Sequence, residues 1–171
     1  MNVLDFAIEM ENDGFEYYNE LANTSTLPGL KTIFTSLAAD ELKHAEVFKA
    51  LNAGETFGRM PASETLETSK NLFKQLPGGT QELNSIADSL KAYQHAMKLE
   101  ANSFRFYEEV AAKETNPEVK DLILQIAKEE HTHFNILENV YNFVNAPNQS
   151  LEWGEFSNLS EFRQFGRDTD G

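Results

Sequence analysis

An internal repeat is the sequence feature that most constrains the fold of this chain. Residues 7–50 align without a gap to residues 96–139, so each residue pairs with the one 89 positions later. Twelve of the 44 pairs are identical, whereas unrelated sequences of average composition would share roughly two or three. Many other pairs are conservative, such as Ile33 with Leu122. The repeat predicts two copies of one structural unit.

Each copy has the pattern of two helices joined by a short turn. Apolar residues recur at helical spacing, and Pro28 suits the first turn of a second helix. In the second copy the break falls at "ETNP", where Pro117 is the equivalent residue. The predicted long helices span residues 3–24, 28–52, about 83–113 and about 117–144.

The connection between the copies, residues 52–81, contains several glycines and two prolines, and a short helix is predicted near residues 63–76. So long a connection suits a crossover between helices that run in the same direction. The predicted fold is all-α: a four-helix bundle of two repeated helix pairs joined by a long crossover. This bundle is expected to form one domain over residues 1–146.

The remaining residues, 147–171, are predicted to form a C-terminal tail. Its large aromatic residues suit packing against the bundle. Subunit interfaces also favour aromatic side chains, so a contact with a second copy of the chain is the alternative. These residues are Trp153, Phe156, Phe162 and Phe165.

Charge and cysteine content exclude several classes of function. A net charge of −14 argues against binding to nucleic acid, which depends on basic residues. Because the sequence contains no cysteine, any metal must be held by carboxylates and imidazoles. The acidic N-terminus does not resemble a signal peptide, and no apolar run reaches the roughly 18 residues of a membrane span. A cytoplasmic location without membrane contact is expected.

Two Glu-x-x-His motifs occupy equivalent positions in the two copies, and a step of three residues places both side chains of a motif on one helix face. The other helix of each copy carries one glutamate near its middle. Helices packed side by side would bring all these side chains to one level of the core, as in di-metal carboxylate proteins. The predicted metal ligands are Glu11, Glu41, His44, Glu100, Glu130 and His133.

The same alignment places the neighbouring acidic and histidine residues outside the predicted site. Glu129 falls opposite Asp40, and His131 falls opposite Leu42. Alanine at Glu129 or His131 is therefore expected to leave metal binding intact. His95 and His131 are predicted to lie at the surface.

The charge of the ligand set indicates the kind of metal. Four glutamates carry about −4, which two divalent cations would neutralise, whereas unpaired charge in a core costs several kcal/mol and is relieved by protonation. Oxygen ligands with two imidazoles suit iron or manganese, and zinc can also occupy such a site in vitro.

Two tyrosines share the face of the first- and third-helix ligands. Tyr18 and Tyr107 lie seven residues after Glu11 and Glu100. They are predicted either to pack in the core or to donate a hydrogen bond to a ligand carboxylate, where a phenol could also enter radical chemistry.

The ligand set, with "FEYYNELA" and "FRFYEEVA" beside it, resembles the rubrerythrin branch of the ferritin-like superfamily over roughly residues 5–145. The resemblance implies a ferritin-like bundle with a di-iron centre. Its bridging ligands would be Glu41 and Glu130, and the histidine of each motif would bind one iron. Glu11 and Glu100 would be terminal carboxylates.

The sequence departs from rubrerythrins in two respects. Rubrerythrins proper usually carry a rubredoxin-like domain with four cysteines, so electrons would here come from a separate donor. They also have an additional glutamate near the third-helix ligand that exchanges with a histidine. The corresponding position is predicted to be Met97, one turn before Glu100. Thioether sulfur is a poor ligand for ferric iron, so this exchange is not expected.

The resemblance implies a non-haem di-iron oxidoreductase that reduces peroxide or O2. One alternative is an iron-handling protein that oxidises or buffers iron without peroxidase turnover. Another is a structural or regulatory bundle that the metals stabilise. The two copies complete the site within one chain, and a homodimer is compatible with this arrangement.

Overall fold

The computed structural model describes residues 2–55, 60, 63–75 and 86–145. Within these ranges it contains five helices and no strand. The helices are α1 (Val3–Thr24), α2 (Pro28–Asn52), α3 (Thr65–Gln75), α4 (Ile86–Lys113) and α5 (Pro117–Asn145). They agree closely with the predicted helices, although the predicted start of the third long helix, near residue 83, lies outside the described residues.

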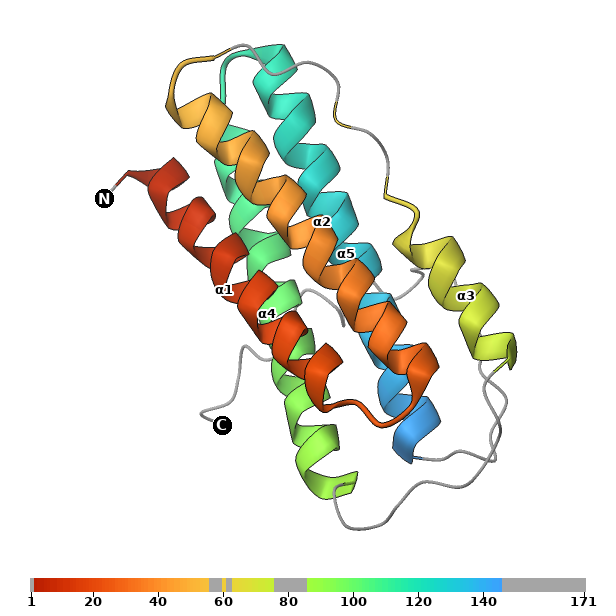
Figure 1. Cartoon of the computed structure of the whole chain (residues 1–171). Coiled ribbons are helices and arrows are strands. Elements are labelled where there is room, and N and C mark those ends of the chain that lie inside the picture. Colours follow the sequence, from red (N-terminus) through yellow and green to blue (C-terminus); the bar gives the residue numbers. More distant parts are fainter. Residues whose placement is uncertain (1, 56–59, 61–62, 76–85, 146–171) are drawn as a thin grey trace.

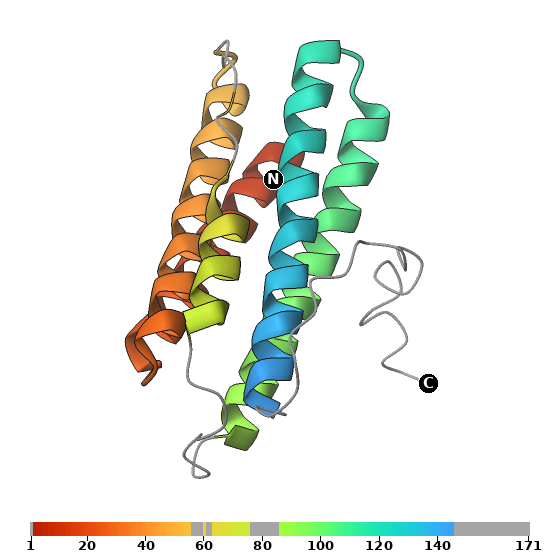
Figure 2. The same ribbon diagram turned by 90° about the vertical axis from the view of Figure 1, so that its right-hand side faces the viewer.

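The four long helices form two hairpins, α1 with α2 and α4 with α5 (Figures 1 and 2). α2 and α4 run in the same direction, and α3, which contacts α2 and α5, runs in the opposite direction (Figure 1). The predicted bundle of two helix pairs joined by a long crossover is therefore confirmed.

Local sequence sets where these helices begin. Asn2 accepts a hydrogen bond from the backbone N–H of Asp5 at 2.8 Å, and the Asp5 carboxylate accepts one in return, which forms a capping box at the start of α1. Pro28 and Pro117 are the first residues of α2 and α5, where the absent N–H of proline costs nothing. The Asn116 side chain accepts a hydrogen bond from the N–H of Glu118 at 3.0 Å.

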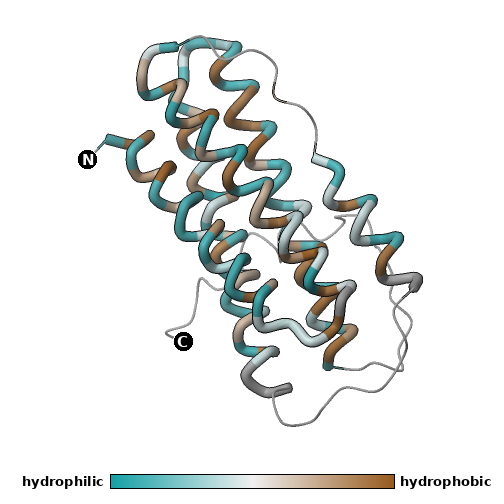
Figure 3. Tube along the Cα trace, in the orientation of Figure 1, coloured by the Kyte–Doolittle hydropathy of each residue, from teal (hydrophilic) through white to brown (hydrophobic). Residues whose placement is uncertain are grey.

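The core runs along the bundle axis, where apolar side chains of both hairpins meet, and the outer faces of the helices are mostly hydrophilic (Figure 3). Phe34 and Leu37 of α2 and Ile126 and Leu137 of α5 are fully buried. Burial of each such side chain contributes roughly 1.5–3 kcal/mol. Backbone contact is extensive within each hairpin and sparse between the hairpins, both for α1 with α4 and for α2 with α5.

Two predictions concern regions at the ends of this fold. The C-terminal tail, residues 147–171, and the predicted domain limit at residue 146 lie outside the described residues.

In the part of the chain that the structure describes, no helix has the length and apolar character needed to cross a membrane.

Candidate metal centre

Six side chains from four helices meet between the two hairpins. α1 and α4 each provide one glutamate, and α2 and α5 each provide a Glu-x-x-His pair on one helix face. Each of these residues is at most 3% exposed. The structure thus brings together all six predicted ligands: Glu11, Glu41, His44, Glu100, Glu130 and His133.

The six side chains form two overlapping groups, each with the residue types and the proximity needed to hold a metal ion. Within a group, one ligand atom from each residue lies within 4.8 Å of all the others. The first group consists of Glu11, Glu41, His44 and Glu130. The second consists of Glu41, Glu100, Glu130 and His133. Glu41 and Glu130 belong to both groups, which is the arrangement expected of bridging carboxylates.

The inner nitrogen of each histidine faces carboxylates from both hairpins. His44 Nδ1 lies 2.9 Å from Glu130 Oε1 and 3.5 Å from Glu11 Oε2. His133 Nδ1 lies 3.0 Å from Glu41 Oε1 and 3.3 Å from Glu100 Oε1, which are the equivalent glutamates in the repeat. The site therefore has an approximate twofold axis that relates the two copies of the repeat.

Several buried ligand atoms lack a hydrogen bond among the described residues. These atoms are Glu11 Oε2, His44 Nδ1, Glu100 Oε2 and Glu130 Oε1. A buried polar atom without a partner costs about 1–3 kcal/mol. His44 Nδ1 and Glu130 Oε1 are close without forming a hydrogen bond, and one cation in each of the two groups would give all four atoms a partner. The residues present therefore fit a metal.

The outer nitrogen of each histidine contacts a carboxylate from the opposite hairpin. His44 Nε2 lies 2.8 Å from Glu129 Oε1, and His133 Nε2 lies 2.9 Å from Asp40 Oδ2. Such partners fix the ring orientation and tautomer of a metal-binding histidine. The prediction that Glu129 lies outside the site is wrong, because Glu129 is buried and holds His44. The repeat contained the signal, since both copies place an acid directly before the motif glutamate.

The two outer carboxylates differ in their surroundings. Asp40 Oδ2 also accepts hydrogen bonds from Ser63 at 2.6 Å and Thr65 at 2.7 Å, so the crossover segment holds it in place. Burial raises the pKa of Asp40, but its contacts with His133 and the hydroxyls outweigh burial and hold that pKa well below its usual range. Lys43 Nζ lies near both carboxylates, 3.6 Å from Glu129 Oε1 and 3.9 Å from Asp40 Oδ1.

The two histidines predicted at the surface have different environments. His131 is only 8% exposed, and its ring packs against Phe104 with centroids 5.2 Å apart, so that prediction is wrong. His95 is exposed as predicted, with its ring beside that of Tyr17.

Tyr18 and Tyr107 each donate a hydrogen bond to a ligand carboxylate across the bundle. The Tyr107 hydroxyl lies 2.5 Å from Glu11 Oε1, and the Tyr18 hydroxyl donates to Glu100 Oε1. Burial and the neighbouring carboxylate charges raise the pKa of both phenols well above 10, which keeps them protonated as donors. The structure therefore shows both core packing and hydrogen bonding to a ligand for these two tyrosines.

Burial and crowding also perturb the ligands. Burial raises the pKa of Glu41 and Glu130 well above its ordinary value, and nearby carboxylates raise it further. Burial disfavours the charged form of His44, but the charge of Glu11 and several hydrogen bonds outweigh it and raise the pKa of His44 to about 10. Without metal the site therefore retains protons at neutral pH, and a bound metal would displace them.

The residues one turn on either side of Glu100 add no carboxylate to the site. Met97 is 5% exposed and belongs to the apolar core. Ser103 lines a cavity that reaches Glu41 and Glu130.

Comparison with known proteins assigns the chain to a family. The rubrerythrin family model matches residues 2–141, which include all six clustered side chains. No curated protein and no solved structure matches the chain. The all-α bundle agrees with the ferritin-like fold of this family, and the buried carboxylate–histidine cluster agrees with its di-iron character. Because the match extends over well more than half of the sequence, the chain belongs to the rubrerythrin family.

Proposed function

We propose that this protein is a di-iron oxidoreductase that reduces peroxide or O2 with electrons from a separate donor. The observation that carries the proposal is the pair of overlapping four-residue groups that share Glu41 and Glu130. Two metals held by shared carboxylates lie close enough to act on one substrate together. The family match supports iron as the metal.

Each histidine would bind one iron, and each copy would add one terminal glutamate. His44 and Glu11 would serve one iron, and His133 and Glu100 the other. Four carboxylates of total charge −4 would balance two divalent ions, so the loaded core would carry little net charge. The oxygen-rich set also admits manganese, and zinc can bind to it in vitro.

When bound, a pair of ferrous ions supplies two electrons, which is the number needed to reduce peroxide to water. The protein holds the ligands in place for this chemistry. Tyr107 and Tyr18 fix the terminal carboxylates, while Glu129 and Asp40 fix the imidazoles. Groups fixed in this way need little reorganisation during the reaction.

The test is an anaerobic Fe(II) titration of metal-free protein, followed by stopped-flow mixing with H2O2 and, separately, with O2. Two Fe(II) per chain and rapid oxidation by H2O2 are expected. Oxidation by O2 alone, without turnover by added reductants, would instead favour an iron-oxidising or iron-buffering protein. No stoichiometric binding would overturn the proposal. Binding that raises the thermal stability without any oxidation would indicate a structural role for the metals.

A further inference from the structure

A cavity between α1 and α4 reaches the candidate metal centre. Its volume is about 320 Å³, and its inner wall contains Glu41, Glu100 and Glu130. A second cavity, of about 410 Å³, lies among Val3, Leu51 and other residues and does not touch the ligands. Only the first of these two cavities therefore offers a route from the surface to the site.

The outer wall of the cavity at the metal centre is mostly apolar. Met10 of α1 and Leu99 and Phe106 of α4 face one another across it, together with Phe6. The Phe6 and Phe106 rings meet edge to face, with centroids 5.1 Å apart. Such walls bind hydrocarbon groups through removal of apolar surface from water.

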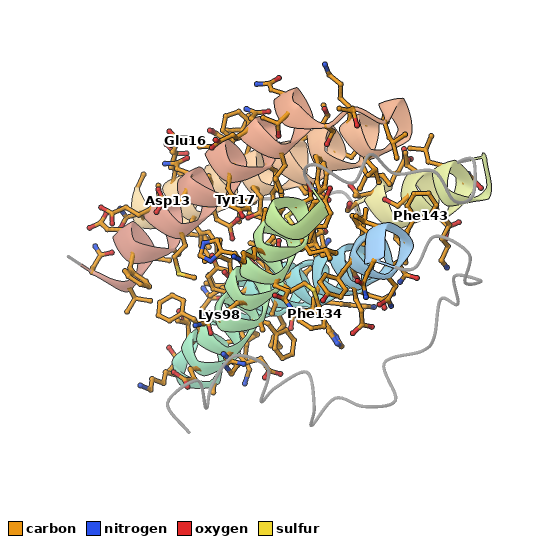
Figure 4. All side chains as sticks on the ribbon, turned by 90° about the horizontal axis from the view of Figure 1, so that it is seen from below. Asp13, Glu16, Tyr17, Lys98, Phe134 and Phe143 are labelled. Carbon is orange, nitrogen blue, oxygen red and sulfur yellow. The ribbon has the colours of Figure 1, made fainter. Side chains whose placement is uncertain are left out.

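Two residues of α1 determine how the cavity is bounded. Tyr17 extends from α1 toward α4, and its hydroxyl donates a hydrogen bond to Ala92 O at 2.8 Å, which ties the two helices together beside the cavity (Figure 4). Gly14 lies over Glu41, and a Cβ at this position would come within 2.9 Å of Glu41 Oε2. The absence of a side chain at Gly14 therefore leaves the bridging carboxylate accessible from the cavity.

The size of the cavity exceeds what peroxide or O2 requires. A single water occupies about 30 Å³ in the liquid, and pockets for small organic molecules begin near 300 Å³. A cavity of about 320 Å³ therefore has room for an organic group beside a pair of oxygen atoms at its inner end.

The charges of the cavity disfavour an anionic ligand. Besides the two tyrosines and the ligands, the polar lining residues are Asp13, Asn102 and Ser103, and the described lining contains no Lys, Arg or His. An anionic group on the outer part of a ligand would therefore meet Asp13 without any compensating cation.

We propose that this cavity binds a neutral organic hydroperoxide, with its hydrocarbon group against Met10, Leu99 and Phe106 and its O–O group toward the carboxylates. This inference rests on the di-iron oxidoreductase function proposed above. The O–O bond breaks as the hydroperoxide takes up two electrons and two protons and leaves as the alcohol and water. The electrons come from oxidation of two ferrous ions to the ferric state.

The first test measures binding and needs no iron. Isothermal titration calorimetry of the metal-free protein with 2-phenyl-2-propanol, the alcohol derived from cumene hydroperoxide, is expected to show saturable binding. Met10→Trp fills the cavity and should weaken binding by about tenfold, whereas Met10→Leu, of similar volume, should retain it. Leu99→Trp, from the opposite wall, provides an independent variant, and circular dichroism verifies that each variant is folded.

The second test measures the rates at which cumene hydroperoxide and H2O2 oxidise the Fe(II)-loaded protein. The rate constant for cumene hydroperoxide divided by that for H2O2 should fall by about tenfold in Met10→Trp or Leu99→Trp. Val110→Phe, which alters the other cavity, is the matched control and should keep the wild-type ratio.

The outcomes separate this inference from the proposed function. Oxidation by H2O2 with no binding of the alcohol, or with an unchanged ratio in both tryptophan variants, would overturn the organic hydroperoxide and leave the di-iron function intact. Failure of both peroxides to oxidise the bound iron would overturn the proposed function and this inference with it.

Discussion

His44 Nε2 lies 2.8 Å from Glu129 Oε1, so a histidine of the first copy is held by an acid of the second. The equivalent contact joins His133 Nε2 to Asp40 Oδ2 at 2.9 Å. Each predicted histidine ligand is thus oriented by a carboxylate of the opposite hairpin. Packing of the two hairpins against each other therefore also orients the histidines of the candidate metal centre.

These two contacts between the hairpins predict that the outer carboxylates, Glu129 and Asp40, control metal affinity. Glu129→Gln and Asp40→Asn should each weaken Fe(II) binding by about 10–100-fold, because an amide cannot stabilise the histidine as a carboxylate does. Asp40→Asn should have the larger effect, since it also disturbs the contacts of Asp40 with Ser63 and Thr65. Anaerobic calorimetric titration measures both affinities. Wild-type affinity in both variants would show that these contacts do not support the metal.

Removal of a shared carboxylate should abolish binding of the metal pair. Glu41→Ala and Glu130→Ala each delete a ligand common to both groups and leave too little negative charge to balance two divalent ions. Iron content after anaerobic loading and desalting is the measurement. Glu46→Ala, which changes an exposed residue of the same helix as Glu41, is the control and should retain two irons per chain. Two tightly bound irons in Glu41→Ala would contradict the assignment.

The buried tyrosines should contribute to affinity through their hydrogen bonds. Tyr107→Phe keeps the ring but releases Glu11 Oε1, and Fe(II) affinity should fall by about tenfold. Tyr18→Phe should act equally on Glu100. Tyr141→Phe is a suitable control, because the Tyr141 hydroxyl accepts its hydrogen bond from Gln94 at an exposed position. An unchanged affinity in both buried variants would assign the phenols to packing alone.

The stability of the metal-free protein should fall as pH rises. The pKa of His44 is about 10 in the folded protein against an ordinary value of 6.5, so the folded state binds more protons between these pH values. Stability from this group is therefore fully present below pH 6.5 and is lost as pH approaches 10. The raised pKa values of Glu41, Glu130 and His133 act in the same direction.

Urea unfolding of metal-free protein at pH 6.5, 8 and 10 measures this dependence, and the expected loss is on the order of a few kcal/mol. Fe(II) affinity should change in the opposite direction, because binding requires the ligands to release protons. His95→Gln alters an exposed histidine and should leave the profile unchanged. A stability that stays constant from pH 6.5 to 10 would contradict the retention of protons in the site.

Gly14→Ala should weaken metal binding without lowering the stability of the metal-free protein. Alanine favours the helix by about 1 kcal/mol over glycine, yet its Cβ would lie 2.9 Å from Glu41 Oε2 and displace the shared carboxylate. The metal-free variant should unfold at an equal or higher urea concentration, while its Fe(II) affinity decreases. Ser103, the equivalent residue of the second copy, already has a Cβ, so the control variant Ser103→Ala should bind iron normally. Equal affinities in the two variants would show that Glu41 can move aside without cost.

The helices and the clustered residues of the candidate site could both be predicted from the sequence alone. Apolar spacing and Pro28 and Pro117 defined the long helices, because these signals act within a few residues of one another. The gapless repeat paired Glu11 with Glu100 and identified the two Glu-x-x-His motifs, and helix geometry placed each motif on one face. All six predicted ligands lie together in the structure.

The residues that surround those ligands could not be predicted in the same way, because they depend on how the two hairpins pack. The contacts of His44 with Glu129 and of Tyr107 with Glu11 join residues 85 and 96 positions apart, and they depend on the relative height and rotation of two docked hairpins. No local pattern specifies that docking. The prediction that His131 lies at the surface was wrong for the same reason. Whether its helix face is exposed depends on packing against Phe104 of the neighbouring helix.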